Sequence, residues 1–265
     1  MEFKVKKLKK MSLIEENFNK IIPSIIHELN EVLDKEEVTL NEVAEVIKKD
    51  VIFTAKVIRL ANAPFYGFPG RIGSVEEALI ILGINTVKII AYTMCIVDVI
   101  NAHYKELSNH SIKVAELSKE LGEKLGFSKI SEIYTAGLLH DFGKVALKVS
   151  EPGYERLKKE AREKKIPLWI AEEQEFGINH AQVAQKFLND WMFPQRIIIP
   201  IAEHHEVSSK KPYSKETAII HIADAIANVA SPEEIESFPG FNSEAITLLN
   251  LSKEQVIELL SNFKI

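Results

Sequence analysis

The spacing of apolar residues is the feature that most constrains the fold of this chain. Apolar side chains recur three and four residues apart almost throughout the 265 residues, and runs of strictly alternating apolar and polar residues are scarce. Capping-box patterns mark three helix starts, at Thr39–Glu42, Ser74–Glu77 and Ser231–Glu234, and the last has proline in the first helical position. The sequence therefore predicts an all-α protein, built as a bundle of many helices without a central sheet.

Two loop-like segments interrupt the helical pattern, at residues 61–73 and 207–214. Asn62 in the first segment is expected to hold that loop. Neither segment resembles a flexible linker between domains, and the chain has no internal repeat or low-complexity tract. The residues that suggest chemistry begin at His110, which favours a functional division near residue 105. We therefore expect three helical parts, over residues 12–103, 104–230 and 231–265.

The composition excludes several classes of site and partner. Cys95 is the only cysteine, so no internal disulfide or cysteine-based metal site can form, which fits a reducing compartment such as the cytoplasm. A net charge of −5 argues against a nucleic-acid binder, whose affinity rests on cationic contacts to phosphate. The apolar run Ile89–Val97 is shorter than the ~20 residues that span a bilayer, and no hydrophobic segment follows the basic residues 1–10. We therefore expect no membrane span and no secretion signal.

Histidines and aspartates form an ordered series in the second half of the chain. His140 and Asp141 end an apolar run, where burial is costly unless such groups are paired or bind a metal. Singly, a histidine at a helix end is most often a surface residue. Together, imidazoles and carboxylates suit divalent iron, manganese, nickel or zinc, and this series is large enough for two ions. The candidate ligands are His110, His140, Asp141, His180, His204, His205 and Asp224.

This series resembles the HD superfamily of metal-dependent phosphohydrolases, and the whole chain resembles its HDOD (HD-related output domain) branch. In the first half the resemblance rests on VTLNEVAEVIKKDVIFTAKVIRLANAPFYG (38–67) and SVEEALIILG (74–83). In the second half it rests on AGLLHDFGKVAL, GINHAQVAQKFLNDW and AEHHE. Both groups occur in the family's order, over roughly residues 12–230. The resemblance implies a helical bundle of the HD-domain type with an N-terminal helical subdomain and a metal site in the second half.

The resemblance also implies a role for each residue of the series. The positions of the basic ligand set are His110, His140, Asp141 and Asp224. The extra ligands of binuclear relatives match His180, His204 and His205, and Asp141 matches the residue that bridges the two ions. Lys144 matches the lysine that contacts substrate phosphate, so Asp141 and Lys144 are the expected catalytic residues.

Two further residues have weaker assignments. Some relatives use a glutamate at the position of Glu106 for a third ion, and the alternative is a solvated surface residue. His221 lies one helical turn before Asp224 and is either an orienting partner of that aspartate or an ordinary histidine on a helix face.

The chain departs from its relatives at two places. Relatives that hydrolyse cyclic di-GMP carry a Gly-Tyr-Pro element after the paired histidines, whereas residues 206–213 here read EVSSKKPY. We therefore expect weak or absent hydrolysis of cyclic di-GMP. Pro200 falls within the helix that presents His204, which predicts a kink or a later start of that helix.

Two functions of different classes fit these observations. The first is a metal-dependent phosphohydrolase or phosphodiesterase that acts on a phosphorylated small molecule or nucleotide. The second is a non-catalytic signalling scaffold that contains metal, in which the site is structural or senses a nucleotide and the N-terminal half docks a protein partner. Signal transduction is the expected context for both.

Overall fold

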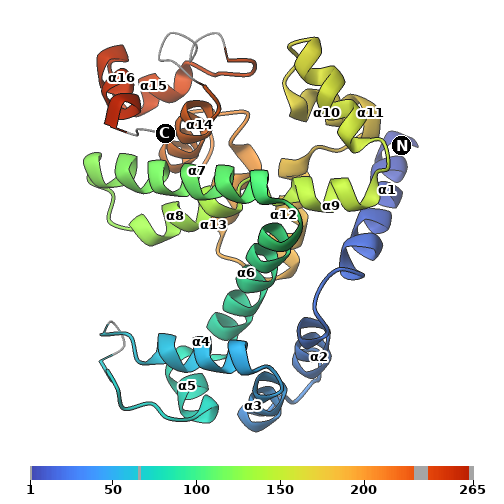
Figure 1. The fold of residues 1–265 in the computed structure, drawn as a ribbon, viewed down its shortest axis with the longest axis vertical. Helices are drawn as coiled ribbons and strands as arrows, with labels where there is room; N and C mark the ends of the chain where they lie inside the picture. Colours follow the sequence, from blue (N-terminus) through green and yellow to red (C-terminus); the bar gives the residue numbers. More distant parts are fainter. Residues whose placement is uncertain (1, 65–66, 230–237, 263–265) are drawn as a thin grey trace. The chain divides into compact units, whose positions relative to one another are not determined.

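The computed structural model describes residues 2–64, 67–229 and 238–262, and these residues form helices joined by turns and loops (Figure 1). No strand occurs in these three ranges, so the predicted all-α fold is confirmed. The capping boxes at Thr39–Glu42 and Ser74–Glu77 are both formed, with the side chain of each cap residue accepting from a backbone N–H three residues on. The third, at Ser231–Glu234, lies outside the described residues.

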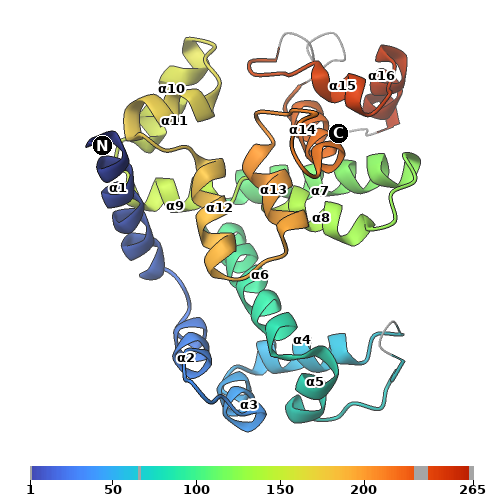
Figure 2. The ribbon, with the colours of Figure 1, turned by 180° about the vertical axis from the view of Figure 1, so that it is seen from behind.

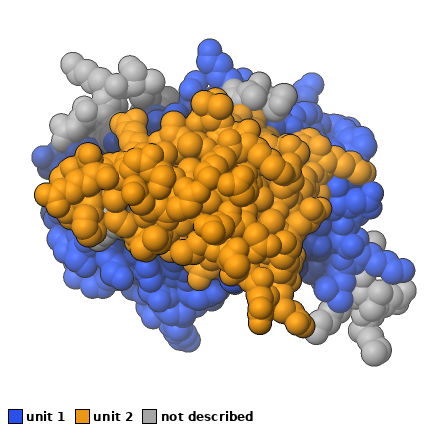
Figure 3. Space-filling model, turned by 90° about the horizontal axis from the view of Figure 1, so that it is seen from below, with its two compact units in different colours: residues 1–18, 103–265 blue, residues 19–102 orange. Residues whose placement is uncertain are grey.

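The chain divides into two compact units, which Figure 3 colours separately. The smaller unit comprises residues 19–102, and the larger unit comprises residues 1–18 and 103–265. The sequence-based division after residue 103 therefore lies one residue from a boundary between the units. Residues 12–18, which we had grouped with the N-terminal part, fall in the larger unit.

The packing of helix α1 explains that difference. Phe18 is buried in a cluster of aromatic rings, with centroids 6.3 Å from Phe142 and 4.9 Å from Phe187. Ion pairs add to the attachment, because Lys10 pairs with Glu151 at 2.6 Å. An apolar helix face shows that a helix is buried but not which core buries it.

The smaller unit consists of five helices joined by short connections among its described residues. They are α2 (Ser24–Leu33), α3 (Leu40–Lys48), α4 (Val51–Ala61), α5 (Val75–Leu82) and α6 (Ile84–His103). Asn62 holds the loop after α4, because its amide donates to the carbonyls of Ile58 and Ile72 and its Oδ1 accepts from the Ile72 N–H at 3.0 Å. This is the role that the sequence predicts for Asn62. Phe65 and Tyr66 of the same loop are outside the described residues.

The larger unit is built around α14, which is buried continuously from Thr217 to Ile226. Helices α7, α8, α13 and α15 pack against it, and α9 and α13 pack against α12 (Figure 2). The helices of this unit are α1 (Glu2–Asn19), α7 (Lys105–Lys124), α8 (Ile130–Leu139), α9 (Gly143–Ser150), α10 (Tyr154–Glu163), α11 (Leu168–Phe176), α12 (His180–Asp190), α13 (Gln195–Glu203), α14 (Ser214–Asn228), α15 (Glu244–Leu248) and α16 (Lys253–Asn262).

The start of α9 is pressed against the start of α12. A Cβ atom added at Gly143 would lie 2.0 Å from the carbonyl oxygen of His180, a separation that no side chain can accept. Glycine at this position therefore allows two helix starts to meet, and it brings the residues before α9 next to the first residue of α12.

Within the described ranges, no single helix has both the length and the apolar content needed to cross a membrane. Helix α5 and residues Ile84–Ile100 are long and apolar enough for a membrane span only when taken together, and the chain bends by 106° between them.

Candidate metal centre

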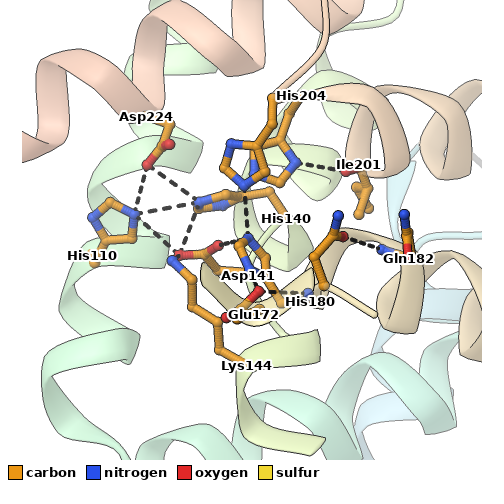
Figure 4. A network of polar contacts seen from close by, with 12 residues as sticks. His110, His140, Asp141, Lys144, Glu172, His180, Gln182, Ile201, His204 and Asp224 are labelled. Atoms are coloured by element: carbon orange, nitrogen blue, oxygen red, sulfur yellow. Dashed lines mark hydrogen bonds and ion pairs between the residues drawn. The ribbon is translucent and has the colours of Figure 1, made fainter. Parts of the chain in front are cut away.

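The seven candidate ligands, which sequence alone places on separate segments, come together in the larger unit (Figure 4). They sit in α7, in the turn between α8 and α9, at the start of α12, after α13 and in α14. Four of them, His140, Asp141, His180 and His204, are almost completely buried. The predicted convergence is therefore present in the structure, and the role of these residues as ligands remains a prediction.

The first group of donors surrounds the Nε2 atom of His110. This atom lies 3.0 Å from Asp224 Oδ1, 3.3 Å from His140 Nε2 and 3.5 Å from Asp141 Oδ2. His140 Nε2 lies 3.3 Å from Asp141 Oδ2 and 3.6 Å from Asp224 Oδ1. Two imidazole nitrogens and two carboxylate oxygens thus share a space in which one cation could contact all four.

The second group contains three histidines. One donor atom from each of His180, His204 and His205 lies within 4.8 Å of the others, and the Nε2 atoms of His180 and His205 are 2.8 Å apart. Asp141 connects the two groups, because its Oδ1 is 3.2 Å from His180 Nε2 while its Oδ2 faces His110 and His140. One buried carboxylate therefore directs an oxygen toward each group.

Backbone carbonyls fix the orientation of two of the imidazoles. The Nδ1–H of His140 donates to Gly137 O at 2.7 Å, and that of His204 donates to Ile201 O at 2.6 Å. Because the carbonyl holds a proton on Nδ1, the neutral form of each ring presents its Nε2 lone pair toward the cluster. His204 Nε2 and Asp141 Oδ1 are both buried without a hydrogen-bond partner. Unsatisfied acceptors beside buried carboxylates fit a cation at this position.

Glu172 of α11 contacts the cluster through His180, and sequence reasoning missed it. Its Oε2 accepts from the backbone N–H of His180 at 2.8 Å and from the Nδ1–H of the same residue at 2.6 Å, and its Oε1 accepts from the Tyr154 hydroxyl at 2.8 Å. The Glu172 side chain is fully buried. A carboxylate that holds the Nδ1–H of an imidazole directs its Nε2 toward a ligand. The only signal in the sequence was a run rich in glutamate before residue 180.

The charges of the cluster favour ionised carboxylates. Burial alone would raise the pKa of Asp141, but His140 and Lys144 beside it hold that pKa well below its usual range. Burial would likewise lower the pKa of His140, but the carboxylates of Asp141 and Asp224 raise it to about 10. Burial lowers the pKa of His204 to about 3, and His140 adds to this effect. The site therefore offers two carboxylate charges and a neutral imidazole in its interior.

Lys144 lies beside the shared carboxylate, and its contact with substrate phosphate, which the resemblance implies, stays a prediction. Its ammonium forms an ion pair with Asp141 Oδ2 from one turn along α9, and the residue is half-buried. It also lines both of the cavities that open at the cluster. A cation at that place can contact both the ligand set and a bound anion.

The structure also places Glu106, His221 and the helix that contains Pro200. Glu106 is exposed and lines the cavity near His110, but it belongs to none of the donor groups found among the described residues. His221 donates to His204 O at 2.7 Å and accepts from the Asn242 N–H at 2.9 Å, so it supports His204. Helix α13 begins at Gln195 and runs through Pro200 to Glu203, and both histidines after it reach the cluster.

Two cavities open beside the cluster, with volumes of about 530 and 310 Å³. His110 and Asp141 line the larger one, and His180, His205 and Asp224 line the smaller one. The residues that line both are Lys144, Lys158, Arg162, Leu168 and Asn228. The donor atoms are thus accessible to a small molecule from two sides.

Comparisons of the sequence and of the structure with known proteins point to the same family. Residues 20–207 match the HDOD domain. An HDOD domain protein of unknown function from Geobacter sulfurreducens is 26% identical, with a TM-score of 0.56 and coverage of 96% of this chain and 94% of that one. A protein from Shewanella amazonensis SB2B, named as a candidate phosphohydrolase, is 21% identical, with a TM-score of 0.55 and 93% of each chain covered.

An uncharacterized protein from Treponema pallidum (strain Nichols) is 22% identical over 191 residues. This match covers 70% of the present chain but 37% of the Treponema protein, so the chain spans little more than a third of that relative. The HDOD match covers well over half of the chain and includes all of the motif histidines and Asp141. The chain belongs to the HDOD family.

Proposed function

We propose that this HDOD protein binds two divalent metal ions and hydrolyses a phosphate ester of a small molecule or nucleotide. The observation that carries the proposal is the placement of Asp141, which directs one carboxylate oxygen toward His110 and His140 and the other toward His180. A cluster that held one structural ion would need only four of these donors. Retention of both groups around one shared carboxylate supports a pair of ions.

The residues present fit such a pair. The donors for one ion are His110, His140, Asp141 and Asp224, and those for the other are His180, His204, His205 and Asp141. Imidazole and carboxylate donors suit iron, manganese, nickel or zinc. When bound, two such ions grip a phosphoryl group and activate water for its hydrolysis.

The chain's own residues have distinct tasks in this proposal. The ammonium of Lys144 neutralises charge that builds on a phosphoryl oxygen, because it reaches the cavity and the shared carboxylate together. Glu172 and the carbonyls of Gly137 and Ile201 hold three imidazoles in position, so that little reorganisation is needed when an anion binds. The fold resemblance to the Shewanella protein, and its name, agree with this assignment.

The proposal is tested by separating metal content from turnover. Protein purified without added metal would be analysed for its elements and screened against phosphomonoesters, nucleotides and cyclic dinucleotides. Lys144→Ala should keep the metal and the melting temperature while lowering turnover by about ten- to a thousandfold, as expected for the loss of one positioned charge. Lys159→Ala, on the face of α10 away from both cavities, is the matched control and should leave turnover unchanged.

Two results would contradict the proposal. If the metal is present but no phosphate ester is hydrolysed, the cluster serves a signalling scaffold. If Lys144→Ala leaves turnover unchanged, the lysine does not act on substrate. We expect little hydrolysis of cyclic di-GMP, because residues 206–213 lack the Gly-Tyr-Pro element.

A further inference from the structure

Helix α10 carries four basic side chains, which differ in whether a carboxylate lies nearby. Arg156 lies 3.5 Å from a Glu175 carboxylate oxygen, and Lys159 lies 3.9 Å from one of Glu163. Lys158 and Arg162 have no carboxylate within 4.0 Å in the described part of the chain. The basic residues of one short helix therefore divide into two with a carboxylate within 4.0 Å and two without one in the described part of the chain.

The unpaired residues are the ones that face the site. Lys158 and Arg162 are four residues apart, which places them on one face of α10, and both line both cavities. Neither Arg156 nor Lys159 lines either cavity. Lys158 is half-buried and Arg162 is exposed. Two cations with no carboxylate within 4.0 Å among the described residues thus border the space that leads to Lys144 and Asp141.

The other charges around the larger cavity do not neutralise this pair. Glu155 forms an ion pair with Lys148 at 2.6 Å and also interacts electrostatically with Lys158, and Glu106 of α7 is a further acidic residue of the lining, but basic residues outnumber acidic ones there. The remaining basic residues, Lys105 and Lys165, each line one cavity. The mouth of the site therefore carries an excess of positive charge, which attracts and binds anions.

We infer that Lys158 and Arg162 form a second anion subsite, so that the preferred substrate carries two phosphate groups. One phosphate lies at Lys144 and the ligand cluster, and the other binds against α10. The inference rests on the proposed function, because it concerns the substrate of the same site. Guanidinium and ammonium groups recognise phosphate oxygens through charge-assisted hydrogen bonds, which are stronger than neutral ones.

The test uses two matched pairs of ligands with the metal-loaded full chain. Calorimetry would compare orthophosphate with pyrophosphate, and fructose 6-phosphate with fructose 1,6-bisphosphate, and metal content would be measured after each titration. These pairs offer a second phosphate that is adjacent to the first or separated from it. The wild type should bind the doubly phosphorylated member of at least one pair about ten- to a hundredfold more tightly, as expected for one or two charge-assisted contacts.

Substitution of the two cations should remove that preference selectively. In Lys158→Gln with Arg162→Gln, affinity for the doubly phosphorylated ligand should fall to about that of its singly phosphorylated partner, whose own affinity stays within about twofold. The control, Arg156→Gln with Lys159→Gln, removes the same charge from the same helix and should retain the preference. Circular dichroism would verify that both double variants remain helical.

The outcomes separate this inference from the proposed function. If the wild type shows no preference in either pair, or if the preference survives the double substitution, the subsite is refuted even when phosphate esters are hydrolysed. If the preference is present and depends on Lys158 and Arg162 but no ester is hydrolysed, the subsite stands and the proposed hydrolase does not.

Discussion

The two compact units differ in what they bury. In the described part of the smaller unit, Lys88 is the one polar or charged residue with a buried side chain, and its ammonium lies 5.9 Å from the centroid of the Tyr92 ring. The larger unit buries many such residues, including His140, Asp141 and Glu172. Burial of a polar group costs folding free energy unless the group has a hydrogen-bond or ionic partner. Without a bound cation, the buried cluster is therefore expected to lower the stability of the larger unit. The comparison predicts that metal affects the stability of one unit only.

The largest expected effect comes from removing the shared carboxylate. Metal that binds only the native state stabilises it by about 3–4 kcal/mol when its concentration is 100 to 1,000 times the dissociation constant. A chelator should therefore lower the melting temperature of the wild type. Asp141→Ala should lose most of its metal and melt at the same temperature with and without chelator, because both groups of donors use this residue.

The control for this prediction is Asp190→Ala, which removes the same charge from an exposed position at the end of α12. It should keep the metal and the response to chelator. A wild type whose melting temperature does not respond to chelator, although metal is present and removable, would contradict the idea that the larger unit depends on metal.

The second effect is in the smaller unit. Leu79 is buried to 1% exposure in α5, so Leu79→Ala should lower the free energy of unfolding by about 2–5 kcal/mol. Its neighbour Ile80 is 70% exposed, and Ile80→Ala should change that free energy by less than about 0.5 kcal/mol. Chemical denaturation with and without chelator should give the same loss for Leu79→Ala. A loss that changes with chelator would show that the two cores are energetically coupled.

A smaller effect is expected from substitution of Glu172. Because Glu172 contacts only His180 among the donors, the substitution should affect one group of donors and not the other. In Glu172→Gln, the oxygen that accepts both N–H groups of His180 loses its negative charge, and the position of the other oxygen becomes an NH2 group that faces the Tyr154 hydroxyl, so the ring is held less firmly. Loss of such an orienting carboxylate typically lowers metal affinity by about 10- to 100-fold. At limiting metal the variant should hold one ion where the wild type holds two.

Glu173→Gln is the matched control, because Glu173 is adjacent and half-buried but contacts Asn179 and Gln182 instead of a histidine of the cluster. It should bind metal as the wild type does. If Glu172→Gln weakens both ions equally, Glu172 supports the fold of the whole site and not the orientation of His180 alone.

The parts of this structure that the sequence predicts well are those with local causes. A capping box such as Thr39–Glu42 requires only residues three positions apart, and the helices that follow have their expected starts. The members of the histidine and aspartate cluster lie far apart in the sequence, but they occur in an order that resembles a known family. The order of histidines and aspartates from His110 to Asp224 therefore carries enough information to predict convergence.

The features that escaped prediction depend on tertiary packing. Glu172 is one of several glutamates in α11, and only its complete burial beside His180 distinguishes it. Lys158 and Arg162 resemble the other basic residues of α10 until the cavities are known. Residues 12–18 belong to the larger compact unit, and periodicity alone does not identify which core buries a helix. In each case the sequence does not show which part of the folded chain packs against the residue.

The smallest expected effect tests how apolar the interior of the smaller unit is. Burial in α6, together with the nearby charge of Asp98, raises the pKa of the Cys95 thiol to about 12 from an ordinary value of 9.0. Because the folded pKa is the higher one, the stability that the protonated thiol contributes is complete below pH 9 and is lost as pH rises toward 12. The free energy of unfolding of the wild type, compared with that of Cys95→Ala, should therefore fall by about 1 kcal/mol between pH 8 and pH 10. Titrations common to both proteins cancel in this difference. A difference that is constant over this range would mean that the thiol ionises as easily in the folded chain as in the unfolded one. Water would then reach the thiol in spite of the apolar side chains that surround it.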